Sequence, residues 1–263
     1  MRVADVALVG ALSVMVAAVR SRREEDLLAT RHIAAVVQHA LLPVLPERIG
    51  PVRCATRYHS ATRTAQVGGD FFDFVADGDR VRIILGDVSG KGVDAAAQAA
   101  RVIRAFRQYA ASEDDLLGAA QRVDEYVTRF WQWEYFATAV FLEVTEGKQL
   151  TVVSAGHPAP LHASPSGIRE LDVHPCVPLG LGAATHRTVH SWDDSDRLLL
   201  YTDGLIEARD AAGSFLPRTA IDAALRAPDA EACLDMLLES VHAHAGRFDD
   251  DLALLLLTRA PSA

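Results

Sequence analysis

Aspartates in four short motifs are the residues of this sequence whose type and spacing can support chemistry. Each of them adjoins an apolar run and stands beside glycine or another aspartate. A carboxylate at the end of a strand is held by rigid backbone, and glycine lets backbone and solvent approach it closely. We therefore expect the motifs to converge on one site at the rim of a sheet. They are Gly68-Gly69-Asp70-Phe71-Phe72-Asp73, Gly86-Asp87-Val88-Ser89-Gly90-Lys91-Gly92, Tyr201-Thr202-Asp203-Gly204 and Asp249-Asp250-Asp251.

Carboxylates gathered in this way need a positive partner. Without matching Lys or Arg they would repel one another and be costly to desolvate. Oxygen ligands without a nearby thiolate or a regularly spaced histidine favour Mg²⁺ or Mn²⁺ over Zn²⁺. Two such ions can share a hydroxide and neutralise the oxygens of a phosphoryl group under in-line attack. The alternative for any single motif is an ordinary Asp-Gly turn, but four motifs that all adjoin strands favour the metal site.

The apolar pattern predicts one α+β domain that positions these motifs. Several predicted strands are almost continuously apolar, as expected where both faces of a sheet are covered. The predicted helices are rich in Ala, Leu, Arg and Gln, and sheets packed between helices are the economical arrangement. Strands are predicted at residues 81–88, 136–144, 149–155, 197–202 and 252–258, and helices at residues 94–111, 114–130 and 230–244.

In their order along the chain, the motifs resemble those of the SpoIIE-like serine/threonine phosphatases of the PPM superfamily of metal-dependent protein phosphatases. The resemblance runs from about residue 41 to residue 257. It implies a four-layer α-β-β-α sandwich with two Mn²⁺ or Mg²⁺ ions at one edge of the sheets. The further motifs that carry it are Leu41-Leu42-Pro43, Phe136-Ala137-Thr138-Ala139, Ser154-Ala155-Gly156-His157-Pro158 and Pro178-Leu179-Gly180.

The same resemblance implies a role for each matching residue. Asp87 would bridge both ions, and Asp73 and Asp251 would flank the site as helping residues. The nucleophile would be metal-activated water, so no side chain of the protein would be phosphorylated. The catalytic metal ligands would be Asp70, Asp87, Asp203 and Asp250, together with the backbone carbonyl of Val88.

A protein of this kind would hydrolyse phosphoserine or phosphothreonine on another protein. The resemblance implies the usual substrate, an anti-anti-sigma factor of the STAS type in a partner-switching pathway. In relatives, the helix before the domain and the helices after the Gly-Lys-Gly turn control assembly of the second metal site. The alternative is a catalytically inactive PPM fold that only binds a partner. Loss of metal ligands would mark that alternative, whereas all four aspartates are present.

Three further residues leave their roles open. Ala253 stands where many relatives have a threonine, which removes a hydroxyl near the site. His157 could act as a general acid, although a strand that ends in a turn favours a structural histidine. Lys91 could meet a substrate phosphate or cap a solvated loop, and the sequence favours neither role.

The first 46 residues differ from the rest of the chain. Residues 6–19 form an uncharged apolar run followed by Arg20, Arg22 and Arg23, and the lack of polar positions at helical spacing favours a membrane anchor over a core helix. The basic flank would place the remainder in the cytoplasm. A helical pattern follows to Leu42, which could form a homodimer or pack on its own domain. We expect an anchor at 1–22, a helical linker at 23–46 and a phosphatase domain at 47–263.

Composition excludes several other classes of protein. The net charge of -9 and the absence of a concentrated Lys/Arg surface argue against nucleic-acid binding. The Gly-Gly-Asp-Phe run differs from the diguanylate cyclase pattern because Phe71 follows the acid. Cys54, Cys176 and Cys233 are far apart in the sequence, so neither a disulfide framework nor a thiolate zinc site is predicted.

Overall fold

The computed structural model describes residues 15, 20, 41–60, 68–131, 134–182, 186–246 and 250–260. Its strands form a six-stranded and a five-stranded antiparallel sheet. The six-stranded sheet contains Arg48–Ile49 (β1), Val52–His59 (β2), Leu161–Ser164 (β7), Gly167–Glu170 (β8), Arg197–Tyr201 (β10) and Leu252–Arg259 (β11), in the order β1-β2-β11-β10-β7-β8. The five-stranded sheet contains Asp70–Asp77 (β3), Arg80–Val88 (β4), Ala137–Val144 (β5), Gln149–Ala155 (β6) and Thr188–Ser191 (β9), in the order β3-β4-β5-β6-β9.

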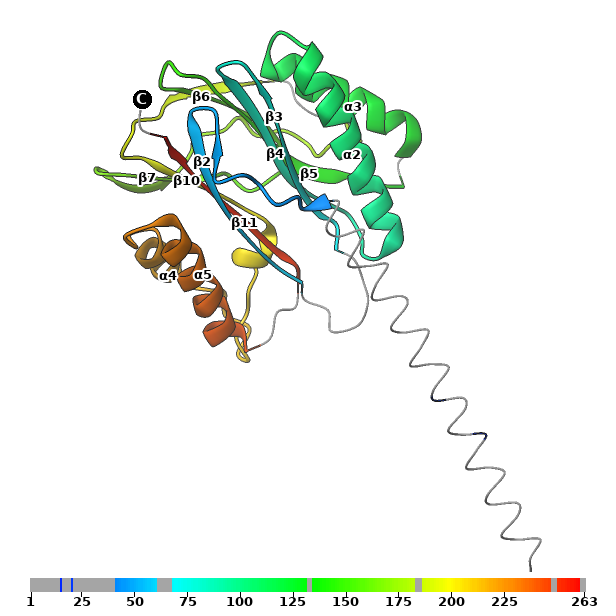
Figure 1. Ribbon diagram of the computed structural model, residues 1–263. Coiled ribbons are helices and arrows are strands. Elements are labelled where there is room, and N and C mark those ends of the chain that lie inside the picture. The colour runs from blue at the N-terminus through cyan, green and yellow to red at the C-terminus, as the bar shows by residue number, and fades with distance from the viewer. Residues whose placement is uncertain are drawn as a thin grey trace, which may run out of the picture.

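Helices cover the outer face of each sheet, which gives four layers (Figure 1). Helices α2 (Val93–Ser112) and α3 (Leu116–Trp131) lie on the five-stranded sheet, and α4 (Arg218–Ala224) and α5 (Ala230–Ala245) lie on the six-stranded sheet. A single 3-10 turn, η1 (Asp203–Leu205), follows β10. This is the α-β-β-α order implied by the resemblance, and it explains why the central strands are apolar on both faces.

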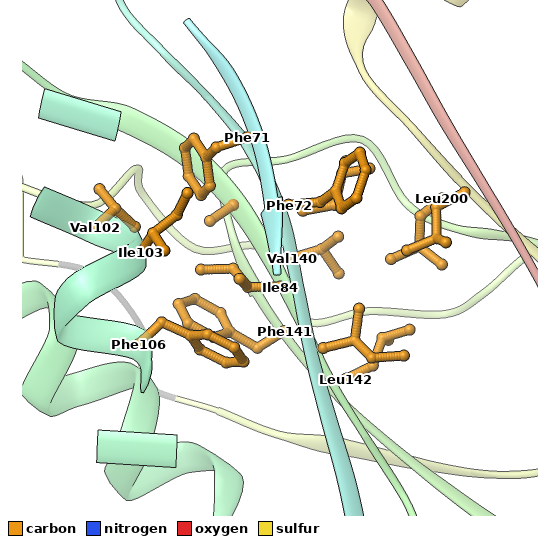
Figure 2. Packing of buried hydrophobic residues seen from close by; sticks show 14 of the residues in the cluster. Phe71, Phe72, Ile84, Val102, Ile103, Phe106, Val140, Phe141, Leu142 and Leu200 are labelled. Carbon is orange, nitrogen blue, oxygen red and sulfur yellow. The ribbon is translucent and has the colours of Figure 1, made fainter. Parts of the chain in front are cut away.

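Alternation of side chains along the strands divides the main core into two halves (Figure 2). Phe71 of β3 points toward α2, whereas its neighbour Phe72 points toward Leu200 of the opposite sheet. On the helical side, the rings of Phe106 and Phe141 lie 6.2 Å apart between centroids. Each fully buried phenylalanine contributes roughly 1.5–3 kcal/mol. The sheets are therefore fixed both to each other and to their helices.

The eight elements predicted from the sequence are confirmed, with ends that differ by at most two residues. Strands β2 and β3 and the short elements β1, β7, β8, β9 and α4 were not predicted. Strand β2 carries Arg53 and Arg57 among its apolar residues, so its pattern alone is weak. Its pairing with β11, from Val52 opposite Arg259 to His59 opposite Leu252, holds it in the sheet.

Apart from residues 15 and 20, the predicted membrane anchor lies outside the described residues, as does most of the predicted linker. Within the described ranges, the structure contains no helix that is long and apolar enough to cross a membrane. At the end of the linker, Leu41, Leu42 and Leu45 are buried against the main core. Apolar contacts therefore hold the segment that leads from the linker into β1 against the domain.

Candidate metal centre

Two of the predicted ligands lie opposite each other in the five-stranded sheet. Asp70 is the first residue of β3, Asp87 is next to the last residue of β4, and the two are partners in the antiparallel register. Asp70 is only 2% exposed. After β4, Gly90 and Gly92 adopt φ values of 96° and 93°, which favour glycine and allow the turn into α2. The two strands therefore hold their carboxylates at one sheet edge.

The other two predicted ligands come from the six-stranded sheet. Asp203 begins η1 directly after β10, and Asp250 shortly precedes β11. These strands are antiparallel neighbours with Tyr201 opposite Leu254, so the end of one lies beside the start of the other. The charges of Asp203 and Asp250 both raise the pKa of Asp87. The two sheets thus bring their acidic ends together, as the sequence predicts.

The pKa values of these carboxyls show how unfavourable the cluster is without a cation. Burial, followed by the charges of Asp203, Asp250 and Asp251, raises the pKa of Asp87 to about 8. Burial and the neighbouring carboxylates also raise the pKa of Asp70 well above its usual value. For Asp203, burial is again the largest cause of a raised pKa, followed by the charge of Asp250. Ionised, these groups need positive charge nearby.

The donor set fits hard divalent ions. The amine at the site is Lys91, whose Nζ lies 2.7 Å from Oδ1 of Asp250 and whose side chain is 48% exposed. One exposed amine cannot balance the buried carboxylates. In the described part of the chain, no three carboxylates place oxygens within 4.8 Å of one another, so ligand oxygens would move closer together when ions bind. Carboxylate and carbonyl oxygens are the ligands that Mg²⁺ and Mn²⁺ take.

Gly69 keeps the backbone open beside the carboxylates. A Cβ at this position would collide with the carbonyl oxygen of Val88 and with Oδ1 of Asp87. The Val88 amide also donates a hydrogen bond to the carbonyl of Gly69, at 3.2 Å. The glycine is thus required by a close approach between β3 and β4 where two of the predicted ligand groups lie.

Replacing Gly69 with Ala is expected to weaken Mn²⁺ binding by about 10–100-fold, the range seen when groups that orient ligands are altered. The added methyl group would displace the Asp87 carboxylate and the Val88 carbonyl. Isothermal titration calorimetry measures the change. Gly147→Ala is the matched control, because a Cβ there meets only Thr145 Oγ1 at 3.8 Å. Equal affinities of both variants would contradict the placement of Gly69.

Thr202 is a site residue that the sequence analysis did not single out. Its side chain is fully buried, and its hydroxyl donates to Oδ2 of Asp70 at 3.0 Å. The same hydroxyl accepts from the amide of Ala253 at 2.9 Å. Ala253 therefore contacts the centre through its backbone. The sequence did offer a signal for Thr202, because this residue directly precedes the predicted ligand Asp203 in one of the four motifs.

His157 joins the two sheets as a structural residue. Its Nδ1 lies 2.9 Å from Oγ1 of Thr138, and its Nε2 lies 3.1 Å from the carbonyl oxygen of Tyr201, to which it donates. Burial lowers the pKa of this imidazole to about 4. With both ring nitrogens engaged and its charged form disfavoured, the geometry agrees with the structural role that the sequence favours.

The buried His157 makes stability depend on pH. The pKa of His157 is about 4 in the folded chain and about 6.5 in the unfolded chain. The unfolded chain therefore binds the proton more tightly, so the free energy of unfolding falls as the pH drops below about 6.5. Between pH 7 and 4.5 the loss is roughly 2–3 kcal/mol for this group. Urea unfolding of the wild type and His157→Gln at both pH values tests this. The variant should be less stable at pH 7 but lose less on acidification, and identical pH slopes would contradict the assignment.

The two flanking acids occupy different places. Asp251 is 6% exposed and its charge raises the pKa values of Asp70 and Asp87, so it lies at the centre. Asp73 instead accepts from Nε of Arg107 in α2, at 2.5 Å. It lies three residues after Asp70 and therefore on the opposite, helix-facing side of β3. The expectation that Asp73 helps at the site is wrong for this reason.

Known proteins resemble this chain in sequence and in fold. The family model described as Stage II sporulation protein E (SpoIIE) matches residues 77–260, which include Asp87, Asp203 and Asp250. Phosphoserine phosphatase RsbP of Bacillus subtilis (strain 168) is 26% identical over 158 residues, which cover 57% of this chain and 39% of RsbP. The chain thus spans about two fifths of the length of this curated relative.

Solved structures share the fold. The RsbU and RsbW domains of Rv1364c from Mycobacterium tuberculosis match with a TM-score of 0.72 and 27% identity, over 84% of this chain and 62% of that one. The SiaA-PP2C domain of Pseudomonas aeruginosa matches with a TM-score of 0.75 and 17% identity, over 90% and 98%. The catalytic domain of the phosphatase PstP, solved with 2 manganese ions, has the same fold at a TM-score of 0.58, with 17% identity over 80% and 98%. Since the family model spans well over half of the residues, the chain belongs to the SpoIIE family.

Proposed function

We propose that this chain is a metal-dependent protein phosphatase that hydrolyses phosphoserine or phosphothreonine on a partner protein. The observation that carries the proposal is the convergence of Asp70 and Asp87 from one sheet with Asp203 and Asp250 from the other. Family membership supports the same activity. All four predicted ligands are present, which favours an enzyme over an inactive binding module.

The residues of the centre would hold two Mn²⁺ or Mg²⁺ ions, which would supply a water of lowered pKa and positive charge for the phosphoryl oxygens. Asp70 is oriented by the hydroxyl of Thr202. Asp250 is held by Lys91 and by the amide of Asp251, at 2.7 and 3.0 Å from its Oδ1. Without cations, the buried carboxylates would repel a phosphate dianion. Substrate binding should therefore depend on the ions.

Hydrolysis of p-nitrophenyl phosphate by the full chain tests the activity. Phosphate release should require Mn²⁺ or Mg²⁺ and stop when EDTA is added in excess. Equal release with EDTA would exclude metal dependence. No release with any divalent ion would transfer support to a partner-binding role.

The proposed substrate is a phosphorylated STAS-type anti-anti-sigma factor in a partner-switching pathway. The similarity to RsbP, which is named a phosphoserine phosphatase, and to the RsbU and RsbW domains of Rv1364c supports this choice. A phosphoserine-containing STAS protein should be dephosphorylated faster than phosphotyrosine peptides of equal concentration. Equal rates would argue against selection of this protein class.

Attachment to the cytoplasmic face of a membrane through residues 1–22, and dimerisation through residues 23–46, also belong to this proposal. The apolar run and the Arg20 flank support the first. Sedimentation velocity of the full chain and of a chain lacking residues 1–40 tests the second. If both sediment as monomers with identical specific activity, the linker is not a regulatory dimer helix.

A further inference from the structure

A second group of metal-binding side chains lies in the loop between β8 and β9. His174, Cys176 and His186 each offer one donor atom, and the three atoms all lie within 4.8 Å of one another. Across the described ranges, no other group of three His, Cys, Asp or Glu side chains meets this spacing. The rings of His174 and His186 are stacked, with centroids 3.6 Å apart and planes at 14°. His186 lies ten positions after Cys176 in the sequence, so only the folded loop reveals the group.

The backbone of this loop is fixed on both sides of the two N-terminal donors. Before them, the amide of Leu171 donates to the carbonyl of Pro160 at 2.9 Å, and Leu171 is 2% exposed. After them, Leu179 exchanges two hydrogen bonds with Ala137 of β5, at 2.8 and 3.1 Å. The Gly180 amide then donates to Oδ1 of Asp124 at 2.7 Å. The core therefore holds both ends of the segment that carries His174 and Cys176 before any ion binds, and a shorter free segment loses less entropy on binding.

One hydrogen bond prepares His174 as a ligand. Its Nδ1 lies 3.0 Å from the carbonyl oxygen of Pro175. A carbonyl can only accept, so Nδ1 carries the proton and the lone pair is left on Nε2. An Nδ1–H donated to a backbone carbonyl is the usual way in which proteins fix the tautomer of a metal-binding histidine.

Partial exposure distinguishes Cys176 from the other two cysteines. Cys54 and Cys233 are buried, and burial raises the pKa values of their thiols to about 12 and about 11. Cys176 is only partly buried and lies beside the two exposed imidazoles. Metal binding requires the thiolate, so the partly exposed cysteine is the one that can serve.

We propose that His174, Cys176 and His186 form a site for a thiophilic transition-metal ion such as Zn²⁺, separate from the carboxylate centre. One thiolate and two imidazoles are ligands that Zn²⁺ and Co²⁺ prefer, whereas Mg²⁺ and Mn²⁺ prefer oxygen. Tetrahedral zinc holds such donors about 3.4–3.6 Å apart. Because the three donor atoms lie within 4.8 Å of one another, they need to close by at most about 1.4 Å. Solvent would supply the fourth ligand. From the wide spacing of the three cysteines, the sequence predicts no thiolate zinc site. The spacing of cysteines alone cannot reveal a site that combines one cysteine with two histidines.

Titration of the reduced full chain with Co²⁺, in excess Mg²⁺ to fill the carboxylate centre, tests the proposal. Binding should produce the near-ultraviolet absorption of a cobalt–thiolate bond, and Cys176→Ser should abolish it. His174→Asn and His186→Asn should each weaken binding by at least about 10-fold, as for altered metal ligands. His244→Asn, on α5, is the matched control and should bind as the wild type does.

Metal analysis after exposure to Zn²⁺ and removal of loosely bound ions gives an independent measurement. The wild type should retain one more zinc per chain than Cys176→Ser, and Asp87→Asn should retain that same ion. Wild type with a confirmed free thiol and no thiolate absorption would overturn the proposal. So would equal zinc content in the wild type and in the variant that combines all three substitutions. Neither measurement depends on phosphatase activity, so failure of the proposed function would not affect the result.

Discussion

Asp87→Asn should reduce Mn²⁺-dependent hydrolysis of p-nitrophenyl phosphate by at least about 100-fold, because altering groups that only orient ligands already costs about 10–100-fold. Asparagine keeps the shape of the side chain but removes the charge. Asp87 lies opposite Asp70, and the charges of Asp203 and Asp250 both act on it. Its loss therefore affects ligands from both sheets. Initial rates at several Mn²⁺ concentrations measure the effect.

Asp73→Asn is the matched control for that experiment. Asp73 lies in the same strand as Asp70 and is also buried, but it faces α2 and pairs with Arg107. Its substitution should lower stability through the lost ion pair and leave the rate per folded molecule unchanged. A comparable loss of rate in both variants would mean that removing any buried carboxylate lowers the rate, and would contradict a specific ligand role for Asp87.

Arg82→Met should lower the free energy of unfolding by about 3–5 kcal/mol, the usual effect of breaking a buried ion pair. The Arg82 side chain is 1% exposed, and its Nε donates to Glu143 at 2.6 Å. Methionine would remove the guanidinium donor from that carboxylate and from three backbone carbonyls, although the carbonyl of Asp114 also accepts from Nη1 of Arg80 at 2.9 Å. The carbonyls belong to Ala110, Glu113 and Asp114, at 3.1, 2.7 and 3.0 Å.

Thermal unfolding followed by circular dichroism should show a midpoint lower by about 6–20 °C for Arg82→Met in a chain of this size. Arg122→Met is the control, because Arg122 is 45% exposed and pairs with an exposed Glu125. A surface pair of this kind is worth about 0–1 kcal/mol. Equal shifts in both variants would show that burial of Arg82 is not what makes its contacts strong.

The elements predicted correctly are those whose own apolar pattern follows from the surfaces that they bury. Strand β6, Gln149–Ala155, has the predicted bounds, and α2 differs by one residue at each end. In β6 burial selects apolar residues at most positions, whereas in α2 it selects them on one face and leaves residues such as Arg104 and Arg107 exposed. The weaker strands are held by their neighbours. Strand β3, for example, carries three aspartates, yet it pairs with β4 along its full length.

The site also combines features that can be recognised within one segment and features that depend on contacts between segments. The residues that supply charge, Asp70, Asp87, Asp203 and Asp250, can be recognised as candidates in the sequence because each adjoins a strand and stands in a distinctive motif. Thr202 stands in one of these motifs, but its role does not follow from the motif, because its contribution is a hydroxyl shared between Asp70 and Ala253. That contact joins strands from both sheets. No periodicity within one segment can reveal it.

The sequence by itself determined the fold class, the candidate acidic ligands and the preference for hard divalent ions, because burial patterns and ligand chemistry are properties of single segments and residue types. Only the tertiary structure decided which face of a strand each acid occupies. It turned Asp73 toward Arg107 and Asp70 toward Thr202. It also brought His174 and His186 beside Cys176. Such pairings depend on strand register and on where loops are anchored, and both are set by contacts between residues far apart in the chain.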